Sequence, residues 1–223
     1  MTALTESANR ARQSRGISNS AIYAMVADVL RRNDAKGQLL LDVGCGTGSL
    51  RPVVEGLCAR YLGVDVVRYD ALPPDVEFVQ FDLETGKAPL PDGTADIVTA
   101  VETIEHVENP RALMRELTRL VKPGGVVVVT TPNQQSLLSL MTLVVKGMHS
   151  AFQDVHYPAH LSALLAIDLR RIARENNLVD ARICFSHEGR IVFTAIHYPA
   201  FISRAFPCAC SDNVLLFARK PRT

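Results

Sequence analysis

Two acidic residues and a histidine form the cluster in this sequence that is best suited to chemistry. Glu102, Glu105 and His106 fall within five consecutive positions. Two carboxylates one helical turn apart, beside an imidazole, can converge on a divalent cation, because hard cations prefer oxygen ligands and imidazole suits many transition metals. The cluster therefore predicts either a cation site that still needs a fourth ligand or a polar loop without a metal.

A glycine-rich turn is the second feature with chemical potential. The run from Gln38 to Val43 is apolar except for Asp42, and Gly44, Gly46 and Gly48 follow at every second position. The run predicts a buried parallel strand, and glycines without Cβ atoms let a ligand approach the backbone. A phosphate-binding P-loop requires a lysine directly after its last glycine, but Ser49 follows Gly48. The spacing of the glycines also differs from the dinucleotide pattern G-x-G-x-x-G. Phosphate binding is therefore disfavoured.

An aspartate lies at the end of the next predicted strand, Tyr61 to Val67. Asp65 follows Gly44 by about 20 positions. A carboxylate at this distance from a nucleotide-binding glycine turn can accept hydrogen bonds from both hydroxyls of a ribose. The alternative role for a single aspartate at a strand end is to cap a helix.

Strands and helices alternate along the chain and must position these residues. The sequence predicts helices near 20–35, 50–59, 111–121 and 165–176, and strands over 39–43, 61–67, 76–83, 95–101, 126–130, 178–185 and 213–220. Such alternation predicts an α/β fold, a doubly wound and mostly parallel sheet with its ligand crevice at the carboxyl ends of the strands. The glycine turn, Asp65, Asp82, the Glu102 cluster and Thr131-Pro132-Asn133 would all lie at that edge.

The stretch from Asp42 to Gly48, Asp-Val-Gly-Cys-Gly-Thr-Gly, resembles the first motif of class I S-adenosylmethionine-dependent methyltransferases. The resemblance implies a Rossmann-like methyltransferase fold with seven strands and a C-terminal antiparallel hairpin. It also implies S-adenosylmethionine as cofactor, with the adenine contact at Asp82 and Leu83. The residues expected around the cofactor are Asp42, Gly44, Cys45, Gly46, Gly48, Asp65, Asp82, Leu83, Val101 and Glu102.

A narrower resemblance concerns the residues after the fourth and fifth strands. Glu102-x-x-Glu105-His106, Thr131-Pro132-Asn133 and a later His160 look like the pattern of small-RNA 2′-O-methyltransferases and ubiquinone-pathway O-methyltransferases. That resemblance implies Mg²⁺ or Mn²⁺ held by Glu102, Glu105, His106 and His160. Many methyltransferases of this class carry Ile-Glu-His without a metal, so a metal-free site stays open. Without one, the candidate catalytic bases are His106, His160 and, less favoured, His156.

Two insertions and a leading segment complete the predicted domain. Residues 1–17 are predicted to be mobile, and residues 18–223 to form a single methyltransferase domain with apolar lid insertions at about 134–160 and 186–212. The apolar run from Leu137 to Val145 is too short to span a bilayer. It predicts either a buried helix or a lid lining the pocket, and contact with a membrane surface is a further alternative.

Composition narrows the partners. Basic and acidic residues number 24 and 23, so no net field favours nucleic acid. Five scattered cysteines fit reduced thiols, and no apolar run suits a transmembrane helix, which together suggest a cytoplasmic protein. The favoured function is O-methylation of a small, apolar molecule. The alternatives are an RNA 2′-O-methyltransferase, a non-catalytic cofactor-binding subunit and a nicotinamide dehydrogenase, and the oligomeric state cannot be read from these residues.

Overall fold

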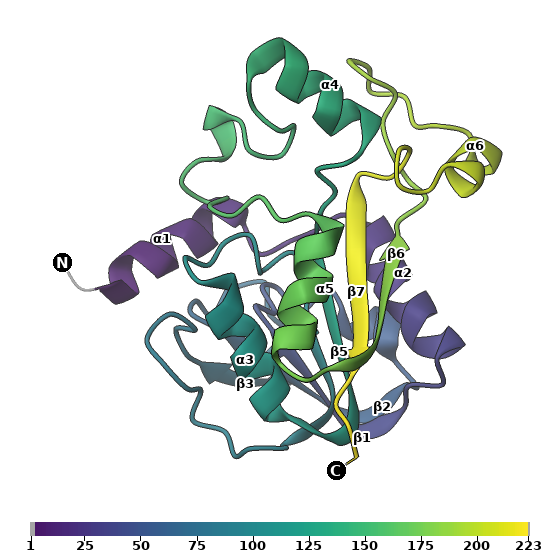
Figure 1. The fold of residues 1–223 in the computed structure, drawn as a ribbon. Coiled ribbons are helices and arrows are strands. Elements are labelled where there is room, and N and C mark those ends of the chain that lie inside the picture. The colour runs from purple at the N-terminus through teal and green to yellow at the C-terminus, as the bar shows by residue number, and fades with distance from the viewer. Residues whose placement is uncertain (1–2, 223) are drawn as a thin grey trace.

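A seven-stranded sheet organises the protein, and a computed structural model describes residues 3–222 of it (Figure 1). The strand order is β3-β2-β1-β4-β5-β7-β6, parallel except for β7, which runs antiparallel to both β5 and β6. The bounds are β1 Gly37–Val43, β2 Cys58–Asp65, β3 Glu77–Gln80, β4 Ala95–Ala100, β5 Val121–Pro132, β6 Val179–Phe185 and β7 Asn213–Arg219. This is the Rossmann-like, mostly parallel sheet with a C-terminal antiparallel pair that the sequence predicts.

Helices cover both faces of the sheet because its central strands are apolar on both sides. Helices α3 (Pro110–Leu120) and α5 (Ala166–Glu175) pack in one core cluster with alternate residues of β1, β4 and β5. Helix α2 (Ser20–Arg32) and the 3₁₀ turn η1 (Arg51–Val54) pack in the other cluster, on the opposite face. The predicted helix over 50–59 is thus only the short η1, because β2 already begins at Cys58.

The segment before Ser18 differs from the sequence prediction, which expected no regular structure there. Residues Ala3–Ser14 form helix α1. Tertiary contacts hold it: Arg10 is buried and forms ion pairs with Glu84 and Glu108, and the Tyr69 hydroxyl donates to the Ala11 carbonyl. The prediction is wrong because these partners lie 58 to 98 positions away and leave no local pattern.

The two insertions form one outer lobe, defined as residues 134–160 and 186–212. It contains α4 (Leu137–Lys146), the 3₁₀ turn η2 (Asp154–His156) and α6 (Ala200–Ala205), at the top of Figure 1. The Leu137 amide donates to the Ala209 carbonyl at 2.8 Å and joins the insertions. The apolar side chains of α4 are exposed, so the expectation of a buried helix is wrong. Among the residues described, no helix has the length and apolar character needed to cross a bilayer.

The central strand β1 supplies a test of this packing. Leu41 is fully buried between β2 and β4, so Leu41→Ala should lower the free energy of unfolding by about 2 to 5 kcal/mol in chemical denaturation. Ile167 is a half-exposed apolar residue on α5, and Ile167→Ala should change it by less than about 0.5 kcal/mol. Equal losses for the two variants would contradict the assignment of β1 to the core.

Candidate active site

The glycine turn after β1 lies where the strand order brings the carboxyl ends of β2, β1 and β4 together. Gly44 has a φ of 75°, and a Cβ atom there would come within 2.3 Å of the Thr103 hydroxyl oxygen. Its amide donates to the Val64 carbonyl at 2.8 Å. Only glycine combines this conformation with this close approach, so the turn depends on Gly44.

The other two glycines of the turn, Gly46 and Gly48, leave room for close contacts with neighbouring segments. A Cβ atom at Gly46 would come within 2.1 Å of the carbonyl oxygen of Gly16, and one at Gly48 would meet Leu72 at 2.8 Å. The Thr47 amide donates to the same Gly16 carbonyl at 3.0 Å. The segment after α1 therefore lies directly on the turn. Among the described residues, Gly46 and Gly48 do not line the cavity, and their expected contact with the cofactor stays a prediction.

Two aspartates at the strand ends differ in the groups that donate hydrogen bonds to them. Asp65 accepts hydrogen bonds from the amides of Gly46 at 2.9 Å and Val67 at 3.2 Å, and it lines the cavity. Asp42 also lines the cavity; it accepts from the hydroxyls of Tyr61 and Thr99, and burial raises its pKa to about 6. Each carboxylate oxygen of the two aspartates thus accepts one hydrogen bond from the protein, and a carboxylate oxygen has a further lone pair for a ligand.

Asp82 and Leu83 follow β3 and line the same cavity. One carboxylate oxygen of Asp82 accepts from the Glu84 amide at 2.9 Å, and the other is buried without a hydrogen-bond partner in the described chain. An unpaired buried acceptor is costly unless a ligand satisfies it. This oxygen fits an exocyclic amine such as that of adenine, as the sequence prediction requires.

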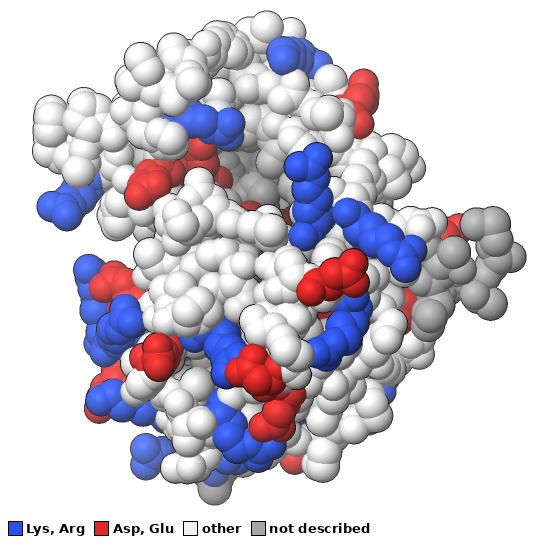
Figure 2. Space-filling view, turned by 180° about the vertical axis from the view of Figure 1, so that it is seen from behind, with Lys and Arg blue, Asp and Glu red and all other residues white. Residues whose placement is uncertain are grey.

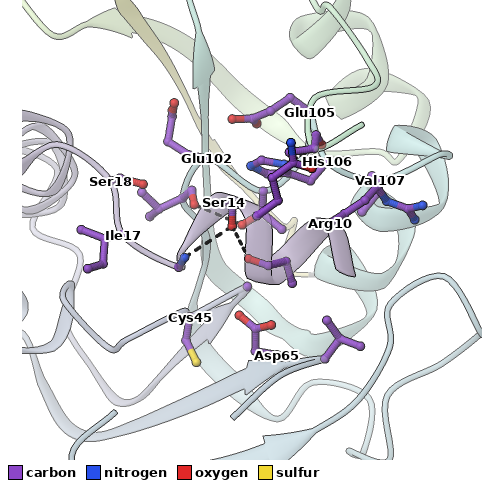
Figure 3. Close-up of a pocket in the computed structure, with 18 of the residues that line it drawn as sticks. Arg10, Ser14, Ile17, Ser18, Cys45, Asp65, Glu102, Glu105, His106 and Val107 are labelled. Atoms are coloured by element: carbon purple, nitrogen blue, oxygen red, sulfur yellow. Dashed lines mark hydrogen bonds between the residues drawn. The ribbon is translucent and has the colours of Figure 1, made fainter. Parts of the chain in front are cut away.

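These residues surround a cavity of about 390 Å³ (Figure 3). Asp65 and Cys45 lie on one side of it, and Glu102, Glu105 and His106 lie on the opposite side. The end of α1 and the segment that follows supply a third wall, which includes Ser14 and other residues that the sequence analysis did not identify: Arg10, Gln13, Ile17 and Ser18. No motif marks them, because their role follows only from the tertiary position of α1.

Glu102 occupies a strained turn and is turned toward the sheet. Its φ is 48°, a conformation uncommon for a residue with a side chain. Thr130 donates to one carboxylate oxygen at 2.8 Å, and Asn213 donates to the other at 3.0 Å. Burial and the nearby Glu105 raise the pKa of Glu102 well above its usual range. These two bonds anchor the turn that presents Glu105 and His106.

Glu105, His106 and His160 converge. One side-chain ligand atom from each lies within 4.8 Å of the other two, whereas Glu102 is outside this group. Glu105 is fully buried, and neither of its carboxylate oxygens has a hydrogen-bond partner in the described chain. Burial raises the pKa of Glu105 to about 8. An isolated buried carboxyl with two imidazoles beside it is a fitting donor set for a divalent cation.

In both His106 and His160, the Nδ1 atom is hydrogen-bonded to a backbone carbonyl. The Nδ1 atom of His106 lies 2.7 Å from the Ala159 carbonyl, and that of His160 lies 2.6 Å from the Ala151 carbonyl. Because a carbonyl only accepts, each Nδ1 carries the proton and each Nε2 keeps its lone pair. Burial lowers both pKa values, to about 4 for His160, so both rings are neutral near pH 7. His156 stacks on His160 and also lines the cavity.

Comparisons with known proteins agree with this geometry. Residues 19–182 match the family described as "Methyltransferase domain". The chain belongs to this methyltransferase family. The fold and the methyltransferase family predicted from the sequence are thus confirmed, and S-adenosylmethionine is the cofactor that this family implies.

Curated relatives of this methyltransferase cover only part of it. The chain is 33% identical over 118 residues to a "Ubiquinone biosynthesis O-methyltransferase" of Albidiferax ferrireducens, covering 48% of this chain and 46% of that one. It is 32% identical over 155 residues to a protein of the same name from Xanthomonas oryzae pv. oryzae, covering 61% and 64%. The chain thus spans about half to two thirds of the length of these relatives.

Solved structures share the fold at low identity. A SAM-dependent methyltransferase from Archaeoglobus fulgidus superposes with a TM-score of 0.62 at 20% identity, covering 89% of this chain and 94% of the other. The [4+2]-cyclase SpnF superposes with a TM-score of 0.59 at 22% identity, covering 90% and 82%. A [4+2]-cyclase shares the fold, so the fold by itself does not define the reaction, which depends on the side chains of the site.

Asp65 offers a test of the cofactor site. Asp65→Ala removes the acceptor expected for the ribose hydroxyls and should weaken S-adenosylhomocysteine binding by about 10- to 100-fold in calorimetry, the loss expected for charged hydrogen bonds. Asp70 is exposed in the following loop and does not line the cavity, so Asp70→Ala should bind like the wild type. Unchanged affinity in a folded Asp65→Ala protein would contradict this assignment.

Proposed function

We propose that this protein transfers the methyl group of S-adenosylmethionine to a hydroxyl oxygen of a small, largely apolar molecule. The observation that carries the proposal is the trio Glu105, His106 and His160 on the wall of the cofactor cavity. The bound cofactor supplies an activated methyl group. A hydroxyl acceptor must also lose its proton, which general-base or metal assistance promotes, and this trio offers the groups for that step.

The residues of the cavity divide this task. Asp65 and Asp82 would hold the cofactor by accepting hydrogen bonds from it, and such positioning can supply ~7 to 11 kcal/mol of the barrier through orientation alone. His106 and His160 present unprotonated Nε2 atoms that can take the hydroxyl proton directly. The His106 and His160 rings are held in place by the Ala159 and Ala151 carbonyls.

A divalent cation, Mg²⁺ or Mn²⁺, fits the trio and would lower the pKa of the hydroxyl. Glu105, His106 and His160 would hold it, and the unpaired Glu105 carboxyl would gain the positive partner that it lacks within the protein. Glu102, the fourth ligand implied by the family resemblance, is instead engaged by Thr130 and Asn213. Its ligation would require both bonds to break, so we propose it as the anchor of the turn.

An apolar acceptor is favoured by the rest of the wall. Ile17, Val107, Val155 and Ala159 line the cavity beside the catalytic side. In our proposal, residues 18–223 act as one methyltransferase domain, and the outer lobe is its lid, since Val155, His156, Ala159 and His160 of that lobe line the cavity. An RNA acceptor is disfavoured because the face in Figure 2 intersperses positive and negative side chains and has no continuous basic groove.

Label transfer tests the reaction. Purified protein, methyl-labelled S-adenosylmethionine and cell extract should yield label in a small-molecule fraction that partitions into organic solvent. His106→Ala should reduce the rate about 100-fold or more, the usual contribution of proton-transfer groups. His197 is exposed, and His197→Ala should react like the wild type. Label in RNA, or equal rates for the two variants, would contradict the proposal.

The Glu105 carboxyl predicts a distinctive pH dependence in metal-free protein. The folded protein keeps a proton on Glu105 up to a pKa of about 8, whereas the unfolded chain releases it near 4.5. Wild-type stability should therefore fall between pH 5 and 8, by up to about 1.4 kcal/mol per pH unit from this group. Glu105→Gln should make that fall shallower in denaturation with a chelator present, since the contribution of other buried carboxyls such as Glu102 remains, whereas exposed Glu55→Gln should leave it unchanged. Parallel curves for wild type and Glu105→Gln would contradict the assignment.

A further inference from the structure

The outer lobe carries an unusual concentration of exposed apolar side chains. In the part of the chain with described side chains, fifteen large apolar residues are exposed, and twelve of them belong to this lobe. They comprise Leu137, Leu140, Met141, Leu143, Val144, Val145, Val155, Tyr157, Phe193, Ile196, Phe201 and Phe206. Figure 2 shows this upper region as mostly uncharged, while charged side chains crowd the body below.

Helix α4 within this lobe has its polar face buried and its apolar face exposed, the reverse of an ordinary surface helix. Its buried residues are Ser139 and Thr142, while its apolar residues other than Leu138 are exposed. The inward polar face is satisfied: Ser139 bonds to Gln134 and His149, and Thr142 donates to the Leu138 carbonyl. The helix is therefore stable with this face inward. Its outward face needs an apolar medium.

We propose that the outer lobe docks on the surface of a phospholipid bilayer, with α4 lying in the interface and its apolar face toward the acyl chains. A helix with one apolar face and one polar face, too short to span, is suited to this position. Val144 at 79% exposure, Val155 at 77% and Phe201 at 74% protrude singly from separate segments. Such protrusions can insert between lipids, whereas a second protein copy would require a matching self-complementary surface.

The single charge of α4 is positive. Lys146, at the carboxyl end of the helix, is the only Lys, Arg, Asp or Glu between residues 134 and 153. Its ammonium group donates to the Gln153 side chain, and no ion pair of Lys146 is found among the described residues. A lysine at the edge of an apolar face can extend its ammonium group to the headgroups. The acidic residues of the lobe that lack ion pairs, Asp154 and Glu188, lie outside α4.

The docked orientation links the bilayer to the cavity. Val155 is both a protruding residue of the lobe and part of the cavity wall. If the proposed function holds, an apolar acceptor dissolved in the bilayer would meet the enzyme at this point. Bilayer docking itself depends only on the lobe.

Flotation with phosphatidylcholine vesicles containing phosphatidylglycerol tests the docking without any methyl transfer. Wild-type protein should float with the vesicles, and the α4 double variant Val144→Gln/Val145→Gln should bind about tenfold or more weakly, because two protruding apolar side chains are lost. The matched control Ile167→Gln/Val179→Gln changes two half-exposed apolar residues outside the lobe and should float like the wild type. Both variants should still bind S-adenosylhomocysteine.

Three results would overturn the proposal. Wild-type protein could stay in the bottom fraction, or the control could lose binding as much as the α4 variant. Sedimentation velocity could instead show a dimer that the α4 variant dissociates while no vesicles bind, which would assign the face to a second copy. If wild-type protein floats with the vesicles but transfers no methyl group, the result would contradict the proposed reaction and leave the proposed docking unaffected.

Discussion

The buried carboxyl of Glu105 is the constraint on which the rest of the site depends. A carboxylate fully removed from water, with no hydrogen bond to either oxygen, is unfavourable by itself. The strained Glu102 turn, held by Thr130 and Asn213, keeps it there. Two neutral imidazoles beside it offer lone pairs and no charge. The protein thus places several unused lone pairs, which can bind a proton or a metal ion, beside the cofactor cavity. In the proposed reaction, the acceptor hydroxyl loses its proton there.

The cofactor side of the cavity is built on a different principle, close backbone packing. Gly44 and Gly46 permit approaches that any side chain would block, and Gly16 closes over the turn from the N-terminal segment. Asp65 links the parts because it bonds to the Gly46 amide and also faces the cavity. Gly16 thus ties the position of α1 to the glycine turn, and the ion pair of Arg10 with Glu84 holds the same helix at the cavity wall.

Most of the sheet, and the presence of Gly44, Asp65 and Asp82 at one cavity, could be predicted because they leave local signals: apolar runs, spaced glycines and aspartates at strand ends. The cavity wall from α1 could not, since Arg10 finds Glu84 only in the folded chain. The sequence also did not indicate which face of α4 is exposed. A helix with apolar residues on nearly all sides is usually buried, whereas here the polar residues Ser139 and Thr142 face inward. The role of Glu102 depends on Asn213, 111 positions away, and no spacing rule connects them.

The most direct test of the account is electron paramagnetic resonance of Mn²⁺ added to the protein with S-adenosylhomocysteine. Free Mn²⁺ gives a sharp signal that diminishes on binding, so a titration counts bound ions. We expect about one bound ion per chain, with an affinity that falls by 10- to 100-fold or more in Glu105→Gln but not in Glu55→Gln. A free-ion signal that is unchanged by wild-type protein, or equal binding by both variants, would contradict the assignment of Glu105, His106 and His160 as a ligand set.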